Sequence, residues 1–175
     1  KLGLVDHVTT DAVAAVQDAD LVVMAVPVGA LGPLAAQIVP AMKPGAVLTD
    51  TGSTKRSVLR DVDPHISGDI HWIPSHPLAG TEHSGPAAGF AELFDGRYWL
   101  VLPREVPEDK VVRFESFVTG MGSVSERMDA DYHDKVLALT SHLPHLIAYT
   151  IVGTAVDLES PVSYTHLRAH ETPVN

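Results

Sequence analysis

Hydrophobic residues in the first half of the chain form short continuous runs separated by stretches with helical spacing. Asp20–Pro27 (DLVVMAVP) and Ala46–Asp50 (AVLTD) are apolar runs, the first rich in valine, and Ile70–Ile73 is a third, shorter one. Such runs are typical of strands that are buried on both faces of a parallel sheet. The segments around them have the caps and spacing of helices, which we predict at Ala12–Gln17, Val28–Met42 and Ser57–Val62.

This alternation predicts an α/β fold, doubly wound and Rossmann-like, with a mostly parallel sheet. Tyr98–Leu102 continues the pattern as a strand, Glu108–Met121 as a helix and Val124–Arg127 as a short strand. Ligands of this fold bind beyond the carboxyl ends of the strands. The loops that begin near Val26, Asp50 and His76 each follow a predicted strand, so we expect them to converge on one edge of the sheet.

The pattern changes after residue 128, which we take as a domain boundary. Asp129–Glu159 is a long, mostly apolar helical stretch interrupted only by Pro144 and Gly153. A helix this apolar must bury itself against something, which indicates a truncated all-helical domain or an obligate dimer partner. Residues 160–175 have no period and resemble a cloning adapter, so we expect a non-native tail there.

Composition narrows the class of function. The 175 residues suffice for one domain and a fraction of another, and the net charge of −10 argues against nucleic acid as a partner. Cysteine is absent, which is compatible with the cytoplasmic location that we expect. We recognise neither an export signal nor a run of about 20 uncharged apolar residues, and therefore expect no membrane span.

The stretch His76–Gly85, HPLAGTEHSG, concentrates polar chemistry in ten residues. Its two glycines and the prolines around it predict an ordered loop at the end of the third strand. A histidine such as His76 can move a proton near neutral pH, and Glu82 follows in the same loop. An ordinary surface turn could contain the same residues, so residue types alone leave both interpretations open.

Two other places could have chemical roles. Ser53 lies in the turn DTGSTK after the second strand, where its local sequence favours a helix N-cap. In SHLPH, His142 and His145 share a helix face unless Pro144 separates them. Ten histidines suggest a metal site, but the chain has no HExxH and no cysteine, so we expect no metal.

Four segments, DLVVMAVPV, DTGSTK, HPLAGTEHSG and SHLPH, together resemble the prephenate dehydrogenase family, which includes the arogenate and cyclohexadienyl dehydrogenases. They occur in the family's order, and the resemblance runs from about Leu2 to Glu159. It implies oxidative decarboxylation of prephenate to 4-hydroxyphenylpyruvate, or of arogenate to tyrosine, with hydride passing to NAD or NADP. It also implies tyrosine biosynthesis as the pathway and a homodimer as the complete enzyme.

The resemblance also suggests roles for individual residues. His76 corresponds to the catalytic histidine that accepts the proton of the substrate's C4 hydroxyl, and Ser53 to a serine that aligns this hydroxyl and the nicotinamide. Further residues correspond to positions that line the substrate pocket, Thr81, Glu82, His142 and His145, or that pack along the dinucleotide, Val26, Pro27 and Val28. For His83, Lys55 and His133 we expect only solvated or structural roles.

The chain also departs from the family pattern. It has no GxGxxG, the turn that holds a dinucleotide pyrophosphate at a helix N-terminus. We therefore interpret residues 1–128 as a partial dinucleotide-binding domain lacking its first strand and Gly-rich turn. Residues 129–159 would be the first helices of a helical dimerisation domain. As it stands, the chain is expected to bind dinucleotide poorly and to turn over little substrate.

Three other interpretations stay open at this point. A 3-hydroxy acid dehydrogenase of similar architecture would need a catalytic lysine on the helical domain, where Lys135 is the single candidate. A His-rich metal-dependent hydrolase is the more distant alternative. In a non-catalytic interaction module, the apolar Val136–Val156 would simply serve as a dimer surface.

Overall fold

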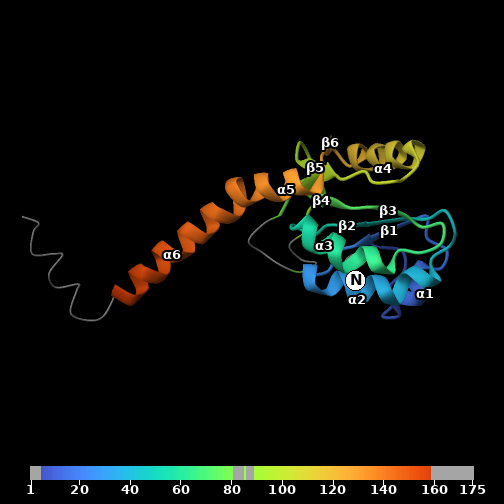
Figure 1. Cartoon of the computed structure of the whole chain (residues 1–175), viewed down its shortest axis with the longest axis horizontal. Coiled ribbons are helices and arrows are strands. Elements are labelled where there is room, and N and C mark those ends of the chain that lie inside the picture. Colours follow the sequence, from blue (N-terminus) through green and yellow to red (C-terminus); the bar gives the residue numbers. More distant parts are fainter. Residues whose placement is uncertain (1–4, 81–84, 86–88, 159–175) are drawn as a thin grey trace, which may run out of the picture. The chain divides into compact units, whose positions relative to one another are not determined.

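The computed structural model describes residues 5–80, 85 and 89–158 (Figure 1). By their internal contacts these residues form two units, one that ends at Asp134 and one that begins at Lys135. The first unit contains all the strands described below.

The first unit contains the predicted alternation of strands and helices. Its strands are β1 (Leu21–Met24), β2 (Val47–Asp50), β3 (His71–Ile73), β4 (Ser75–Pro77), β5 (Tyr98–Val101) and β6 (Val124–Arg127). Its helices are α1 (Ala12–Val16), α2 (Leu31–Ile38), α3 (Lys55–Val62), α4 (Glu108–Gly120) and the beginning of α5 (Ala130–Leu137). Short 3-10 turns, η1 (Val28–Ala30), η2 (Val39–Ala41), η3 (Asp63–His65) and η5 (Ala91–Phe94), join them. The elements that the hydrophobic pattern predicts are thus confirmed, with bounds that differ by a few residues.

The strands form two three-stranded sheets, and the continuous stretch of residues 71–77 contributes one strand to each. β1, β2 and β3 are parallel, with Val22 opposite Leu48 and Leu48 opposite Trp72. After Pro74 the chain continues as β4, which pairs antiparallel with β5, while β5 and β6 are parallel. With three of the four strand pairs parallel, the expected α/β fold with a mostly parallel sheet is confirmed.

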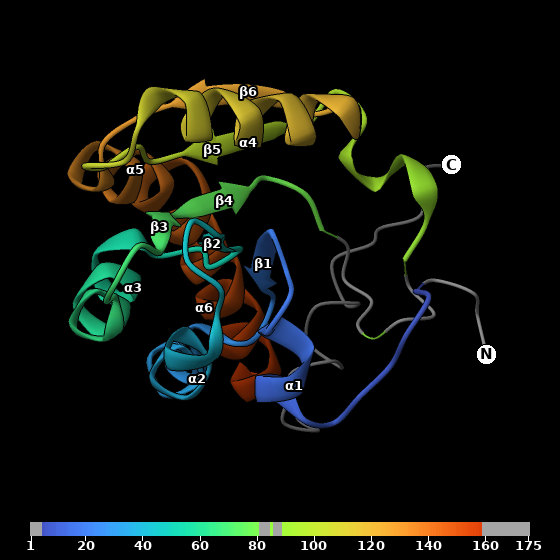
Figure 2. The same cartoon turned by 90° about the vertical axis from the view of Figure 1, so that its right-hand side faces the viewer.

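Helices cover both faces of the β1–β2–β3 sheet, which makes the unit doubly wound (Figure 2). Leu48 and Trp72 belong to a core with side chains from α1, α2 and α3. Their neighbours Val47 and Ile73 face the other way, toward a core that Phe114 and other residues of α4 complete. Because successive side chains of a strand point to opposite faces, apolar residues are needed at every position, as in a continuous hydrophobic run.

The expectation that His76 opens a loop is wrong. Ser75–Pro77 is the strand β4, in which His76 lies opposite Leu100 of β5. The prolines and glycines of the segment suggested a turn, but a partner strand more than 20 residues later provides the pairing. His76 is therefore held in a β-sheet, and residues 78–80 follow β4 without regular structure.

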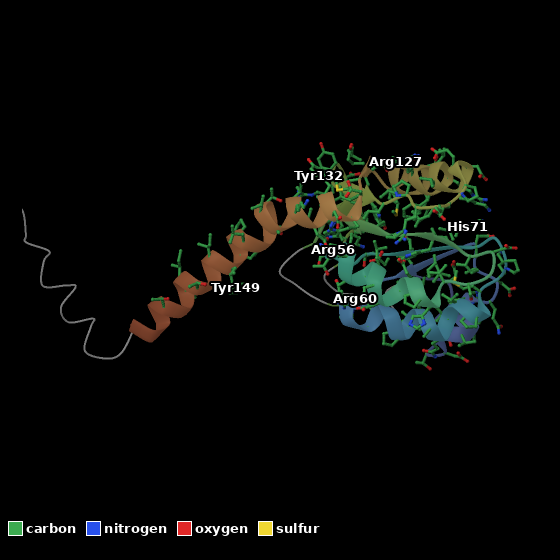
Figure 3. All side chains as sticks on the ribbon, viewed as in Figure 1. Arg56, Arg60, His71, Arg127, Tyr132 and Tyr149 are labelled. Atoms are coloured by element: carbon green, nitrogen blue, oxygen red, sulfur yellow. The ribbon has the colours of Figure 1, made fainter. Side chains whose placement is uncertain are left out.

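The second unit is helical. It contains the rest of α5, a π-helical turn η6 (Ala138–His142) and α6 (Leu143–Leu158). Neither Pro144 nor Gly153 breaks the helix, and the π-helical turn η6 ends two residues before Pro144, where the missing N–H of proline interrupts the regular hydrogen bonding. Many apolar side chains of α6 are exposed, among them Leu146, Ile151 and Tyr149 (Figure 3).

The continuous helical stretch Ala130–Thr154 has 25 residues and contains an 18-residue window with a mean hydropathy of 1.4. By length and composition alone it could cross a membrane, so our expectation that no such segment exists is wrong. Long core helices of soluble proteins share these properties. That no membrane is a partner stays a prediction.

Candidate active site

The imidazole of His76 is buried at the sheet and contacts a second imidazole from a distant part of the chain. Nδ1 of His76 lies 2.9 Å from Nε2 of His133, and the two rings are tilted by 60°. His133 is completely buried in the first turn of α5. Asp129 caps this helix, because its carboxylate accepts a hydrogen bond from the Tyr132 N–H and its carbonyl one from the His133 N–H.

A carboxylate continues this line of groups. Nδ1 of His133 lies 2.8 Å from Oδ1 of Asp134, the next residue. The same carboxylate accepts hydrogen bonds from the backbone N–H groups of Lys55 at 2.7 Å and Arg56 at 2.9 Å. These are the first N–H groups of α3, which have no partner within the helix. Asp134 therefore caps α3 from a position 79 residues further along the chain.

The cap of α3 differs from the one suggested by the sequence. Thr54, not Ser53, occupies the N-cap position, and its side chain makes no capping hydrogen bond. Its hydroxyl instead lies 2.7 Å from that of Ser57. The interpretation of Ser53 as a helix cap is thus wrong, since the carboxylate of Asp134 takes over that function.

Burial and hydrogen bonding set the protonation states of this pair. Burial lowers the pKa of His133, and this outweighs the opposing effect of Asp134. Burial raises the pKa of Asp134, but the N–H groups of Arg56, His133 and Lys55 together lower it further. Near neutral pH, Asp134 is therefore ionised and His133 is neutral.

A second polar network lies within the sheet beside His76. The ammonium of Lys55 is completely buried and donates to Oδ2 of Asp50 at 2.6 Å and to the carbonyl of Ser75. Asp50 also accepts from the backbone N–H groups of Gly52 and Ser75. The turn Asp50–Lys55 is thereby fastened to the residue that precedes His76. Of the two roles expected for Lys55, solvated or structural, the structure supports the structural one.

The hydroxyl of Ser75 completes this network. It donates to the carbonyl of Asp50 at 2.7 Å and accepts the indole N–H of Trp99 at 2.9 Å, and Thr49 Oγ1 lies 2.9 Å away. Because the single hydroxyl proton of Ser75 is used toward Asp50, Thr49 must donate. The three strands β2, β4 and β5 are thus fixed to one another directly beside His76.

The residues predicted to contact the dinucleotide follow the carboxyl ends of adjacent strands. Met24 and Asp50 are paired at the ends of β1 and β2, and the Thr51 N–H donates to the Met24 carbonyl. Val26, Pro27 and Val28 come after β1, with Pro27 exposed. Ser53 is exposed in the turn after β2. The structure therefore brings these two loops together, as the fold class implied.

The other predicted site residues lie outside the described residues or in the second unit. Thr81, Glu82 and His83 lie outside the described residues. His142 ends the π-helical turn and His145 lies in the first turn of α6, both in the second unit. Nδ1 of His145 lies 2.7 Å from the carbonyl of Ser141. Their role in substrate binding stays a prediction.

Sequence reasoning missed the two residues that contact each other next to His76. His133 was expected to be solvated or structural, and Asp134 was not considered. The available signal was the His-Asp pair in the first turn of a predicted helix, because a carboxylate beside a histidine often orients it. Which histidine they would support could not be read from the sequence.

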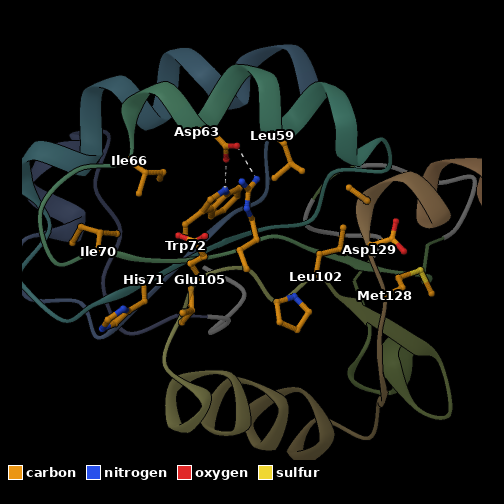
Figure 4. A pocket seen from close by; sticks show the side chains of 14 residues that line it. Leu59, Asp63, Ile66, Ile70, His71, Trp72, Leu102, Glu105, Met128 and Asp129 are labelled. Carbon is orange, nitrogen blue, oxygen red and sulfur yellow. Dashed lines mark hydrogen bonds and ion pairs between the residues drawn. The ribbon is translucent and has the colours of Figure 1, made fainter.

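The described part of the first unit also contains a groove of about 600 Å³ whose lining does not include His76, His133 or Asp134 (Figure 4). Trp72 lies in it, with its indole N–H bonded to Asp63, which also pairs with Arg104. None of the predicted site residues lines this groove. Among the described residues, no three His, Asp or Glu side chains are arranged to hold a metal ion.

Comparisons with known proteins agree on one family. Residues 1–127 match the nucleotide-binding domain of prephenate dehydrogenase, and residues 129–169 match its dimerization domain. Over 153 residues the chain is 45% identical to a cyclohexadienyl dehydrogenase of Zymomonas mobilis, covering 87% of this chain and 52% of that protein. It is 33% identical over 159 residues to a prephenate dehydrogenase of Lactococcus lactis, covering 90% of this chain and 43% of that protein.

A solved structure is similar as well. It is a prephenate dehydrogenase from Aquifex aeolicus in complex with hydroxyphenyl propionate and NAD+, with 29% identity and a TM-score of 0.82. The match covers 91% of this chain and 56% of that one, so the chain spans about half the length of the relatives it matches. On the match of its nucleotide-binding part, this chain belongs to the prephenate dehydrogenase family.

Proposed function

We propose that this chain is the catalytic part of an NAD- or NADP-dependent oxidoreductase that oxidatively decarboxylates prephenate or arogenate in the biosynthesis of tyrosine. The observation that carries the proposal is the buried His76, which contacts His133 and which the motif resemblance matches to the family's catalytic histidine. The names of the relatives support it too, since one is a cyclohexadienyl and another a prephenate dehydrogenase. No observation favours a 3-hydroxy acid dehydrogenase or a hydrolase.

The chemistry needs one proton acceptor at a defined place. The C4 hydroxyl of the substrate donates a hydrogen bond to His76, which accepts its proton as the C4 hydrogen leaves as hydride. The C–CO2 bond breaks, its electron pair enters the ring, and the ring becomes aromatic as CO2 departs. The bound dinucleotide supplies the hydride acceptor. The C4 oxygen then takes the proton back from His76, so the net products are a phenol, CO2 and the reduced dinucleotide.

The loops at the carboxyl ends of β1 and β2 fit the dinucleotide. The relative from Aquifex aeolicus binds NAD+ and shares this fold. In this chain, Val26 and Val28 pack partly against the core and so hold a defined surface at the strand end, while Pro27 is exposed beside them. We assign these three residues to contact with the dinucleotide and the exposed Ser53 to the nicotinamide and the substrate hydroxyl.

The remaining assignments rest on the family resemblance. Thr81 and Glu82 would line the substrate pocket, as would His142 and His145 of the helical unit. The match of residues 129–169 to a dimerization domain supports a homodimer, and the exposed apolar residues of α6 suit such a contact. A cytoplasmic location is part of the same proposal.

A chimera provides the test of this function. The matched residues of this chain replace their counterparts in the cyclohexadienyl dehydrogenase of Zymomonas mobilis, so that its flanking segments are retained. Reduction of NAD and of NADP is then followed by absorbance with prephenate or arogenate. His76→Asn should lower kcat by at least about 100-fold with a smaller change in KM, because the proton acceptor is lost.

The exposed His7→Asn provides the matched control and should have the activity of the parent. A folded chimera that binds NAD but oxidises neither substrate would contradict the proposal. Equal activity of His76→Asn and the parent would remove His76 from its role.

A further inference from the structure

We propose that Asp134 and His133 act as positioning residues that fix the tautomer of His76, so that its Nε2 holds the lone pair that accepts the substrate proton. The inference rests on the proposed function for the identity of the proton, but its structural part can be tested without any turnover. It starts from the order of the contacts: the α3 N-terminus, Asp134, His133 and His76 follow one another at 2.7–2.9 Å.

The first step concerns Asp134. Its carboxylate receives the backbone N–H groups of Lys55 and Arg56 at the positive end of α3. These contacts favour the ionised form, and an ionised carboxylate can only accept hydrogen bonds. The atom that faces it, Nδ1 of His133, must therefore carry a proton and donate.

The second step concerns His133. Burial favours the neutral ring of His133, and a neutral imidazole has one N–H donor and one unprotonated nitrogen that accepts a hydrogen bond. With the proton on Nδ1, Nε2 of His133 is the acceptor, and it lies 2.9 Å from Nδ1 of His76. Nδ1 of His76 must then be the donor. In neutral His76 this leaves the lone pair on Nε2.

The charges around His133 are consistent with this assignment. The carboxylates of Asp134 and Asp50 raise the pKa of His133, whereas the ammonium of Lys55 lowers it and so disfavours a second proton on this ring. When Nε2 of His76 accepts a proton, the new imidazolium keeps its Nδ1–H bond to His133. The positive charge is then stabilised through the neutral ring by Asp134, without any further proton transfer.

The arrangement is tested directly by nitrogen NMR of the histidine rings in the 175-residue chain. Long-range proton–nitrogen correlations show which ring nitrogen carries the proton. We expect Nδ1–H for both His133 and His76. A native His76 that is protonated at Nε2 near neutral pH would overturn the inference.

Two replacements of His133 separate positioning from packing. His133→Gln introduces an amide oxygen that can accept a hydrogen bond from Nδ1 of His76. His133→Leu has a side chain of similar size without a hydrogen-bond acceptor. His76 should keep the Nδ1–H form in the Gln variant and lose it in the Leu variant. Thermal unfolding shows whether each variant is folded, and if Leu is not, the tautomer in the Gln variant decides.

Activity of the chimera provides the second measurement. We expect His133→Leu to lower kcat by about 100-fold with KM nearly constant, and His133→Gln to restore most of this loss. Asp134→Asn should also lower kcat, while Asp131→Asn, on the exposed side of the same helix, should not. Equal kcat in the Leu and Gln variants, either both high or both low, would exclude the positioning role.

The two proposals can fail separately. Expected tautomers in a chimera that oxidises neither prephenate nor arogenate would retain the positioning role and remove the proposed substrates. Full activity with His76 protonated at Nε2 would retain the function and remove the role of His133 and Asp134.

Discussion

The ammonium of Lys55 donates to the carboxylate of Asp50 across 2.6 Å, and both side chains are completely buried. Burial lowers the pKa of Lys55, and Asp50 opposes this as the nearest opposite charge. The pair also joins the turn after β2 to the carbonyl of Ser75, next to His76. Its main effect is therefore to hold two strand ends in one arrangement beside the candidate active site.

Removing one partner of this buried pair should be strongly destabilising. Lys55→Met leaves the carboxylate of Asp50 buried without its ammonium, and we expect the free energy of unfolding to fall by about 3–5 kcal/mol. Urea unfolding measures it. The double variant Asp50→Asn with Lys55→Met should be more stable than Lys55→Met alone, and a double variant of lower stability would contradict this explanation. Lys43→Met, which removes an exposed pair with Asp20, should change stability little.

The capping role of Asp134 predicts a stability effect of its own. Asp134→Ala removes the acceptor of the first N–H groups of α3, and the free energy of unfolding should fall by about 1–2 kcal/mol. Asp131→Ala is the matched control on the same helix, since Asp131 pairs with Arg56 of α3 at the exposed surface. Equal stability of the two variants in urea would show that the carboxylate of Asp134 does not cap α3.

The lowered pKa of His133 predicts a dependence of stability on pH. As the pH falls through the ordinary value of 6.5, the unfolded chain takes up a proton at this residue while the native state does not. The unfolded state then binds more protons, so the stability of the native state decreases. The groups that face His133 are His76, Asp134, Lys55 and Asp50. Burial outweighs the two carboxylates, which raise the pKa of His133, and Lys55 lowers that pKa further.

The measurement compares the parent chain with His133→Gln by urea unfolding between about pH 8 and about pH 5. The stability of the parent relative to the variant should fall as the pH is lowered. A constant difference would mean that His133 titrates at its ordinary pKa in the native state.

Any side chain at Gly52 should destabilise the fold for steric reasons. A Cβ atom at this position would lie 2.8 Å from Oδ2 of Asp50 and 2.9 Å from Cγ2 of Val58. Gly52→Ala should therefore lower the free energy of unfolding by about 1–3 kcal/mol and loosen the turn that carries Ser53. Gly29→Ala meets open space and serves as the control. Equal melting temperatures of the two variants would contradict the close packing.

Much of the fold could be predicted from local pattern. Apolar runs such as Asp20–Pro27 and Ala46–Asp50 indicated buried strands, because a strand covered on both faces needs apolar residues at successive positions. β4 could not be predicted in this way. Its three residues include a proline, and their pairing with β5 depends on a segment far away in the sequence.

The sequence by itself determined the family, because the family follows from the order of short motifs, and the same motifs made His76 the candidate proton acceptor. Only the tertiary structure decided what supports that histidine. His76 and His133 are separated by 57 residues, and the N-terminus of α3 and Asp134 by 79. Contacts over such separations follow from how α3, β4 and α5 pack in the first unit, and no local periodicity reports that packing. For the same reason a buried Lys55 and a solvated lysine have the same appearance in the sequence, and only the fold distinguishes them.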